Sequence, residues 1–300
     1  MYDIIVIGAG PAGLTAAIYA RRAEKSVLVI EKSNFGGQMT HSPKIENYPA
    51  FGQISGLELS DKMVEQALEL GAEIEPDEVI AVKDMGTFKR VVCEGGEFDG
   101  RTLIIAVGVK HRQLGLEREN ELCGNGVSYC AVCDGAFYKG KVVGVVGGGN
   151  SALQEAILLS ETSQKVYVIQ NLDCLTGEVK MQNKIAALDN VEVILGATVE
   201  KLIGDSELTA VALKTADGTL ELKLDGLFVA IGLLPKNDIF AEIASLNYGG
   251  YFDSDESCKT NTEGVFVAGD CRNKAIRQIT TATADGAVAA LAACRYLESL

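Results

Sequence analysis

Two stretches of the chain share one alternation of apolar and polar positions. Each begins with an apolar run, continues through a glycine turn and an amphipathic stretch, and ends in a second apolar run. They cover residues 6–32 and 145–171 and align without a gap at an offset of 139 residues (147 − 8). The turn positions coincide: Gly8 with Gly147, Gly10 with Gly149, and Gly13 with Ala152. This pattern predicts two strand–helix–strand units of the kind that binds dinucleotides.

Three more apolar runs end in glycine or a glycine-containing turn and predict further strands. "LIIAVG" (103–108) resembles "LFVAIG" (227–232), and "VFVAGD" (265–270) follows near the end of the chain. The order of these runs predicts that the second domain is inserted into the first. We therefore expect an α/β fold with two Rossmann-like three-layer dinucleotide-binding domains. The predicted boundaries are 1–112 and 247–300 for the outer domain, which carries the first dinucleotide-binding unit, and 113–246 for the inserted domain, which carries the second.

Composition narrows the class of partner. Of 300 residues, 27 are Lys or Arg and 41 are Asp or Glu, which gives a net charge of −14. Such a chain is a poor ligand for nucleic acid or for an anionic membrane, because both require a positive surface. No apolar run reaches the ~20 residues of a membrane span, and "MYDIIVIGAG" lacks the basic region of a signal peptide. We therefore expect a cytoplasmic protein that binds neither nucleic acid nor membranes.

The first unit carries the acidic residue that a dinucleotide site requires. Glu31 ends the second apolar run, eighteen residues after Gly13 (31 − 13). A carboxylate at this place accepts hydrogen bonds from the ribose hydroxyls of an adenosine. The diphosphate would meet the N–H groups at the start of the helix. These residues predict FAD or NAD as the ligand of the first unit.

The two cysteines that lie close together, Cys130 and Cys133, occur in "CAVCDG" (130–135) before the second glycine turn. Three interpretations compete: a zinc site, two packed thiols, and a redox-active dithiol. Zinc needs two more ligands at metal spacing, but the chain has no second CxxC motif and its histidines are His41 and His111. A redox dithiol is therefore favoured, and no metal is expected.

Additional motifs lead to a family resemblance. The chain contains "GAGPAGLTAAIYA", "GGQ", "ENYP", "CAVCDG", "GGGNSA", "VFVAGD" and "RQI". With these motifs it resembles the low-molecular-weight thioredoxin reductases over essentially its whole length. The resemblance implies a homodimer with FAD as cofactor and thioredoxin as partner. It also implies FAD contacts from Gly8, Gly10, Ala12, Gly13, Glu31, Gly37, Gln38, Asn47, Gly269, Asp270, Arg277 and Gln278.

The resemblance also assigns roles within the CxxC motif. It implies that Cys133 faces the flavin and that Cys130 attacks the substrate disulfide. Asp134 follows directly and would act as general acid for the leaving thiolate. A helix cap or a turn is the structural alternative for Asp134 and does not exclude this role.

The second unit departs from the pattern of the NADPH-dependent reductases in this family. Gln170 occupies the place of Glu31, and residues 170–176 contain Asp173 but no Lys or Arg. An NADP site needs a basic residue there for the 2′-phosphate, and Asp173 would repel that group. The second glycine turn is therefore interpreted as scaffold rather than as a working nicotinamide site.

This departure resembles the ferredoxin-dependent flavin thioredoxin reductases, and reduced ferredoxin is the favoured electron donor. One alternative is an NAD(P)H-dependent reductase that uses NADH weakly through Gln170 and the turn. Another is a flavin-binding redox protein without thioredoxin turnover, against which the intact CxxC-Asp sequence counts. A basic landing patch for ferredoxin would consist of Lys110, His111, Arg112 and Arg118, although a solvated linker is the alternative for these residues.

Overall fold

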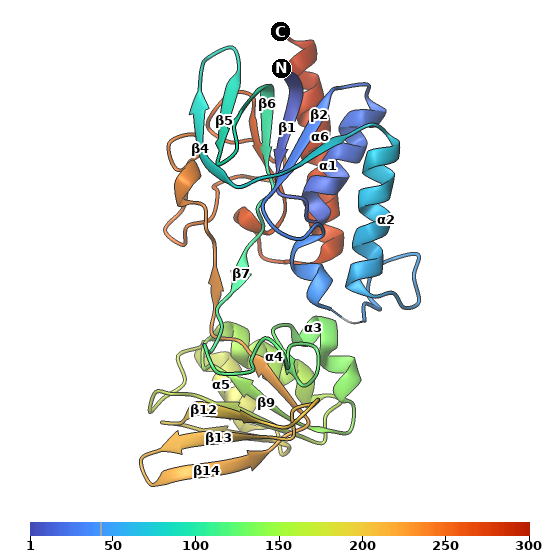
Figure 1. Cartoon of the computed structure of the whole chain (residues 1–300). Coiled ribbons are helices and arrows are strands. Elements are labelled where there is room, and N and C mark those ends of the chain that lie inside the picture. Colours follow the sequence, from blue (N-terminus) through green and yellow to red (C-terminus); the bar gives the residue numbers. More distant parts are fainter. Residues whose placement is uncertain (43) are drawn as a thin grey trace. The chain divides into compact units, whose positions relative to one another are not determined.

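The computed structural model describes residues 1–42 and 44–300 and divides into two compact units. The first unit comprises Met1–Lys110 and Pro235–Leu300, and the second comprises His111–Leu234 (Figure 1). The two crossings of the chain between them pair as short strands, β7 (Lys110–His111) with β16 (Leu233–Leu234).

The second domain boundary falls after Leu234, earlier in the chain than the predicted residue 246. The intervening segment contains the short 3-10 helix η3 (Asp238–Phe240). Phe240 and Ile243 are buried with strands of the first unit in one apolar cluster. This packing assigns the segment to the first unit, although "LLPKND" carries the polar and proline-containing composition of a linker.

The first unit is built on a mixed sheet in the order β3-β2-β1-β6-β5-β4, with β17 also paired to β6. Strands β3, β2, β1, β6 and β17 pair with one another in parallel, whereas β5 is antiparallel to both β6 and β4. Their bounds are β1 Tyr2–Ile7, β2 Val27–Glu31, β3 Glu73–Pro76, β4 Val79–Asp84, β5 Lys89–Cys93, β6 Glu97–Ile105 and β17 Val265–Val267. Residues 4–7 of β1 are buried, as expected for a parallel strand covered on both faces.

Helices α1 (Pro11–Arg22) and α6 (Ile279–Glu298) pack closely beside this sheet (Figure 1). Small residues permit the close approach, because a Cβ at Gly286 would collide with the carbonyl oxygen of Ala12. Helix α2 (Gly56–Glu69) packs on α1, and the Ser55 hydroxyl caps it by accepting the Glu58 N–H at 3.1 Å. The 3-10 helices η1 (Gly37–His41) and η4 (Gly269–Cys271) complete this unit.

The second unit repeats the parallel arrangement, with its main sheet in the order β11-β10-β9-β15-β8. A second, antiparallel sheet has the order β12-β13-β14. The strands are β8 Val127–Ser128, β9 Val142–Val146, β10 Lys165–Ile169, β11 Val191–Ile194, β12 Thr198–Ile203, β13 Ala210–Thr215, β14 Gly218–Lys223 and β15 Gly226–Val229. The helices are α3 Ala131–Asp134, η2 Gly135–Tyr138, α4 Asn150–Ser160 and α5 Val179–Ala186. Across the described residues of both units, no helix has the length and apolar character to cross a membrane.

Candidate functional site

The first glycine turn connects β1 to α1, and its three glycines have different surroundings. Gly8 has a φ of +104°, and a Cβ there would collide with the carbonyl oxygen of Ala106. A Cβ at Gly13 would collide with the Gly8 carbonyl, but a Cβ at Gly10 would meet no atom of the described residues within 4 Å. Gly8 and Gly13 are therefore required for packing. Gly10 leaves open space at the start of α1, where the backbone approaches a diphosphate in dinucleotide sites.

Glu31 ends β2 and contacts the same turn. Its Oε2 accepts the Ala9 N–H at 2.8 Å, and its Oε1 accepts the N–H and hydroxyl of Ser33 at 2.9 and 3.0 Å. A carboxylate has about four acceptor positions. These contacts fix the side chain beside the turn and leave it capacity for a ribose hydroxyl.

Residues far apart in the sequence meet near η1. A Cβ at Gly37 would lie 3.4 Å from the Gly10 Cα atom, so the predicted "GGQ" motif adjoins the first turn. Gln38 follows with an exposed side chain. The side chain of Asn47 donates a hydrogen bond to the Gln278 side chain at 3.2 Å. The structure therefore brings together predicted residues from both ends of the chain.

The turn after β17 presents Asp270 from a buried position. Its Oδ1 is buried and has no hydrogen-bond partner among the described residues, and burial raises its pKa to about 6. A buried carboxylate oxygen of this kind fits a hydroxyl donor such as the ribityl chain of FAD. Gly269 has a φ of +79° and its N–H donates to Asp285 at 2.9 Å, which orients the turn. A Cβ at Gly269 would lie 2.9 Å from the Ala12 Cβ, so Ala12 packs beneath this turn.

Arg277 and Gln278 lie at the start of α6. The Arg277 Nε donates to the Asp270 carbonyl oxygen at 3.3 Å, and its guanidinium lies over the ring of Tyr251 at 4.4 Å. Gln278 is the N-cap residue of α6 and forms a capping box with Thr281. Both residues border the end of a helix whose N-terminal dipole stabilises negative charge.

Asp270→Asn is expected to stabilise the FAD-free protein while weakening FAD binding. The folded-state pKa near 6 exceeds the ordinary 3.8, so the cost of the buried charge is absent below the unfolded pKa and complete above about pH 6. The full cost is about 3 kcal/mol. The advantage of the variant in free energy of unfolding should therefore grow by about 1.5 kcal/mol from pH 5 to pH 8. Urea denaturation of both proteins tests this, and an advantage that is independent of pH would contradict it.

The CxxC motif forms a disulfide between Cys130 and Cys133 at the start of α3. The Cys133 N–H donates to the Cys130 Sγ at 3.2 Å, which would stabilise a thiolate on Cys130 after reduction. Asp134 follows, and its Oδ2 accepts the hydroxyl of Ser128 at 2.6 Å. Its Oδ1 is buried without a partner in the described part of the chain, and burial raises the pKa of this carboxyl.

Two residues of the CxxC region, Ser128 and Glu155, were not predicted from the sequence. Ser128 orients Asp134, and its hydroxyl also accepts the Cys130 N–H at 3.1 Å. Glu155 lies on α4 with one buried carboxylate oxygen, and the backbone of Ala131, between the two cysteines, acts on its charge. Ser128 could have been predicted from its position two residues before the CxxC motif. Nothing in the sequence distinguishes Glu155 from a solvated helix residue.

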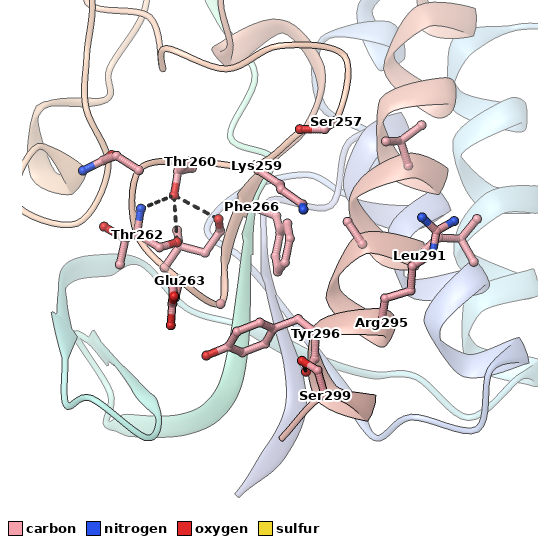
Figure 2. Close-up of a pocket in the computed structure, with 15 residues that line it drawn as sticks. Ser257, Lys259, Thr260, Thr262, Glu263, Phe266, Leu291, Arg295, Tyr296 and Ser299 are labelled. Atoms are coloured by element: carbon pink, nitrogen blue, oxygen red, sulfur yellow. Dashed lines mark hydrogen bonds between the residues drawn. The ribbon is translucent and has the colours of Figure 1, made fainter.

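Two further features bear on the site, namely the possible metal ligands and a cavity in the first unit. The described residues contain no cluster of His, Cys, Asp and Glu that could hold a metal ion. A cavity of about 600 Å³ lies between residues 257–266 and the C-terminal half of α6 (Figure 2). Its lining includes Lys259, Glu263 and Arg295 but none of the predicted FAD or redox residues.

The second glycine turn is covered by its own chain. Gln170 is only 5% exposed, and its amide lies over Gly148 and donates to the Cys174 carbonyl at 3.3 Å. The N–H groups of Thr176 and Gly177 donate to the Gly148 carbonyl at 2.8 and 2.9 Å. The segment after β10 therefore folds back onto the turn.

The same segment reaches the start of α4. The Asn150 Oδ1 accepts the Glu178 N–H at 2.7 Å, and its amide donates to the Glu178 carboxylate at 3.2 Å. An acidic side chain thus contacts the first residue of α4, at the end of the helix where dinucleotide sites bind a diphosphate.

Comparisons with known proteins identify the family. Residues 2–286 match the family described as pyridine nucleotide-disulphide oxidoreductase. A thioredoxin reductase from Listeria innocua is 43% identical, covering 100% of this chain and 95% of the relative. The structure of a thioredoxin reductase from Streptococcus pyogenes superposes with a TM-score of 0.97 at 38% identity, covering 100% and 99% of the two chains. A ferredoxin-flavin thioredoxin reductase from Clostridium acetobutylicum superposes with a TM-score of 0.55 at 32% identity, covering 100% and 99%.

These matches span nearly the entire chain, and they confirm the predicted α/β fold class and the predicted FAD cofactor. The open space at Gly10 and the unpartnered oxygen of Asp270 fit that cofactor. The chain therefore belongs to the low-molecular-weight thioredoxin reductase family of pyridine nucleotide-disulphide oxidoreductases, and it is an FAD-dependent flavoprotein enzyme.

Proposed function

We propose that this enzyme passes electrons through the Cys130–Cys133 dithiol to thioredoxin and receives them from a ferredoxin-type protein rather than from NADPH. Bound FAD supplies the two-electron reduction of the disulfide. The protein's own residues hold the cofactor, expose a nucleophilic sulfur and supply a proton to the departing thiolate. We also propose that the protein forms the homodimer that the family resemblance implies.

The contacts around the disulfide support separate roles for its sulfurs. The N–H that Cys133 donates to the Cys130 Sγ stabilises the thiolate form of Cys130, and a thiolate is the species that attacks a disulfide. Burial favours the neutral form of Asp134, which is the form that can donate a proton. These features support Cys130 as the nucleophile, Cys133 as the sulfur that exchanges electrons with FAD, and Asp134 as the general acid.

The site residues for FAD are proposed on similar grounds. The first turn offers N–H groups and open space for the diphosphate, Glu31 offers an acceptor for the ribose, and Asp270 offers one for the ribityl chain. The start of α6, with Arg277 and Gln278, would stabilise negative charge on a reduced flavin.

The covered second turn is the observation that carries the choice of donor. A nucleotide diphosphate at the start of α4 would meet the Glu178 carboxylate beside Asn150, and the segment that holds Glu178 is tied to the turn by the hydrogen bonds of Thr176 and Gly177 to the Gly148 carbonyl. It would gain no Arg or Lys from residues 170–178 in return. Each missing charge-assisted hydrogen bond costs about 1.5–3 kcal/mol. These terms together disfavour NADPH by several orders of magnitude in affinity.

The predicted landing patch for ferredoxin is smaller than its sequence suggests. The ring of His111 lies against Tyr129 at 5.4 Å, and burial lowers the pKa of His111, so this residue is neutral at pH 7. Arg118 pairs with Glu121 and donates to the carbonyls of Gly204 and Asp205. The exposed cations of the patch are therefore Lys110 and Arg112, and salt should weaken donor binding only moderately.

The alternative donor is NAD(P)H. The second glycine turn keeps the backbone conformation that a nucleotide-binding turn has. Gly147 has a φ of +128°, and a Cβ there would lie 2.6 Å from the Ala230 carbonyl oxygen. This conformation matches that of Gly8 in the first turn. The same geometry is also needed for packing of the strand against α4, so it does not by itself indicate a bound nucleotide. A flavin-binding protein without thioredoxin turnover is the third possibility.

Anaerobic stopped-flow absorbance with each donor separates these proposals. Reduced ferredoxin is expected to bleach the flavin and to support thioredoxin reduction, whereas NADPH and NADH bleach it at least about a hundredfold more slowly. Fast bleaching by micromolar NADPH would overturn the choice of donor. Bleaching by ferredoxin without thioredoxin reduction would support the third possibility.

A further inference from the structure

A second buried carboxyl lies beside the redox disulfide. Glu155 belongs to α4, which packs on α3, the short helix that carries Cys133 and Asp134. Packing between these parts is tight, because a Cβ at Gly135 would lie 3.1 Å from the Leu159 Cδ2 on α4. The backbone of Ala131, between the two cysteines, acts on the charge of the Glu155 carboxylate, which places that carboxylate near the CxxC motif.

The carboxyl groups of Asp134 and Glu155 are alike in their hydrogen bonding. Asp134 Oδ1 and Glu155 Oε2 are both buried, and neither has a hydrogen-bond partner within residues 1–42 and 44–300. An ionised carboxylate oxygen in such a place is costly, whereas a proton on either group relieves part of that cost. Buried carboxyls that interact in this way titrate as a pair and hold a proton at a pH where isolated carboxyls would not.

We propose that Glu155 and Asp134 form a coupled carboxyl pair, in which Glu155 returns a proton to Asp134 after Asp134 has protonated a leaving thiolate. This inference rests on the proposed role of Asp134 as general acid. Glu155 acts through Asp134 and is therefore a positioning residue for the proton.

The step balances within the dithiol exchange. The Cys130 thiolate attacks the thioredoxin disulfide, a bond from the Cys130 Sγ to one thioredoxin sulfur forms, and the other sulfur leaves and takes a proton from Asp134. Cys133 then gives its proton to the carboxyl pair and attacks Cys130, the Cys130–Cys133 bond forms again, and the second thioredoxin sulfur leaves and takes a proton from the pair. Thioredoxin gains two electrons and two protons. The dithiol starts as one thiolate and one thiol and supplies both electrons and one proton, and the pair supplies the other proton, which it took up when the Cys130 thiolate formed.

The electrostatic surroundings of Glu155 are consistent with its proposed role of returning a proton to Asp134. Burial, together with the charge of Asp134, raises the pKa of Glu155 to about 7. Tyr138 also lies near Asp134, but burial raises its pKa to about 12, so it stays neutral. Among the described residues, Asp134 is the charged side chain that raises the pKa of Glu155. Glu155 is thus protonated below neutrality and loses its proton as the pH rises through about 7.

Single-turnover reduction of thioredoxin tests the proposal without any electron donor. The FAD-bound protein is reduced with dithiothreitol, desalted anaerobically and mixed with an oxidised thioredoxin that contains tryptophan. The chain itself has no tryptophan, so the fluorescence change reports thioredoxin alone. Rates are measured from pH 6 to pH 8.5 for wild type, Glu155→Gln, Glu155→Asp and the control Glu161→Gln. Glu161 is an exposed carboxylate just beyond α4.

The wild-type rate is expected to fall as the pH rises through about 7. Glu155→Gln should lower the rate at pH 6 by about tenfold or more and remove that dependence, because an amide holds no transferable proton. Glu155→Asp should restore the dependence in part, and Glu161→Gln should match wild type. A Glu155→Gln profile that is parallel to wild type, or equal to it, would overturn the proposal.

A spectroscopic measurement keeps this test separate from the proposed function. Infrared difference spectra between the disulfide and dithiol forms are expected to contain a protonated-carboxyl band that Glu155→Gln removes and Glu161→Gln retains. If wild type failed to reduce thioredoxin, the proposed function would be wrong, but this band would still report the carboxyl pair. A band unaffected by Glu155→Gln would overturn the pair.

Discussion

Cys133→Ser is expected to abolish thioredoxin turnover and to accumulate a covalent mixed disulfide between thioredoxin and Cys130. The remaining sulfur is the one that accepts an N–H from residue 133, and serine retains that backbone donor. Cys130 therefore keeps its stabilised thiolate and can attack, but no second sulfur is present to resolve the product. Turnover should fall by at least about a thousandfold, as is usual when a nucleophile pair is broken.

Cys130→Ser should lose turnover to the same extent but form no such adduct. The matched control is Cys174→Ser, since Cys174 is an exposed free cysteine in the same unit and should leave turnover and adduct formation unchanged. Intact mass measurement on acid-quenched, non-reduced samples detects the adduct, with thioredoxin supplied in its disulfide form so that its second sulfur is the leaving group. An adduct with Cys130→Ser and none with Cys133→Ser would reverse the assigned roles of the sulfurs.

Much of this site was predictable because its determinants are local. Glycine turns with fixed spacing between a strand and a helix specify their own backbone geometry, and the structure has Gly8 and Gly147 at positive φ in equivalent places. Glu31 was predictable for the same reason, since its distance from the turn is set by one helix and one strand. The family and the FAD cofactor followed from several such motifs in order.

Features that depend on tertiary packing were not predictable. Glu155 has an ordinary helical position, and only the packing of α4 on α3 buries its Oε2 atom. The boundary at Leu234 depends on burial of Phe240 and Ile243 in the first unit, which composition does not show. The absence of basic residues after β10 was visible in the sequence. The return of this segment to the Gly148 carbonyl was not, because those hydrogen bonds use backbone atoms that every residue has.

Gly10→Ala should weaken FAD binding by about 10- to 100-fold, whereas Gly149→Ala should leave FAD binding and ferredoxin-driven turnover unchanged. The two positions are equivalent N-caps with φ of −77° and −85°, which alanine adopts without strain. A Cβ at Gly10 meets only the open space proposed for the diphosphate. Each lost charge-assisted hydrogen bond there costs about 1.5–3 kcal/mol. Flavin retained after gel filtration, and titration of the FAD-free protein with FAD, measure the effect.

The second substitution distinguishes the two donors in the same experiment. A Cβ at Gly149 would lie 3.8 Å from the Thr176 hydroxyl, an ordinary contact with a segment that already covers the turn. If no nucleotide binds there, Gly149→Ala removes nothing that the reaction uses. If NADPH were the donor, the methyl group would obstruct its diphosphate and raise the KM for NADPH by a factor similar to the loss of FAD affinity in Gly10→Ala. Thermal unfolding of both FAD-free variants near the wild-type temperature would show that each effect arises from ligand binding, since neither added methyl group has a close neighbour within residues 1–42 and 44–300.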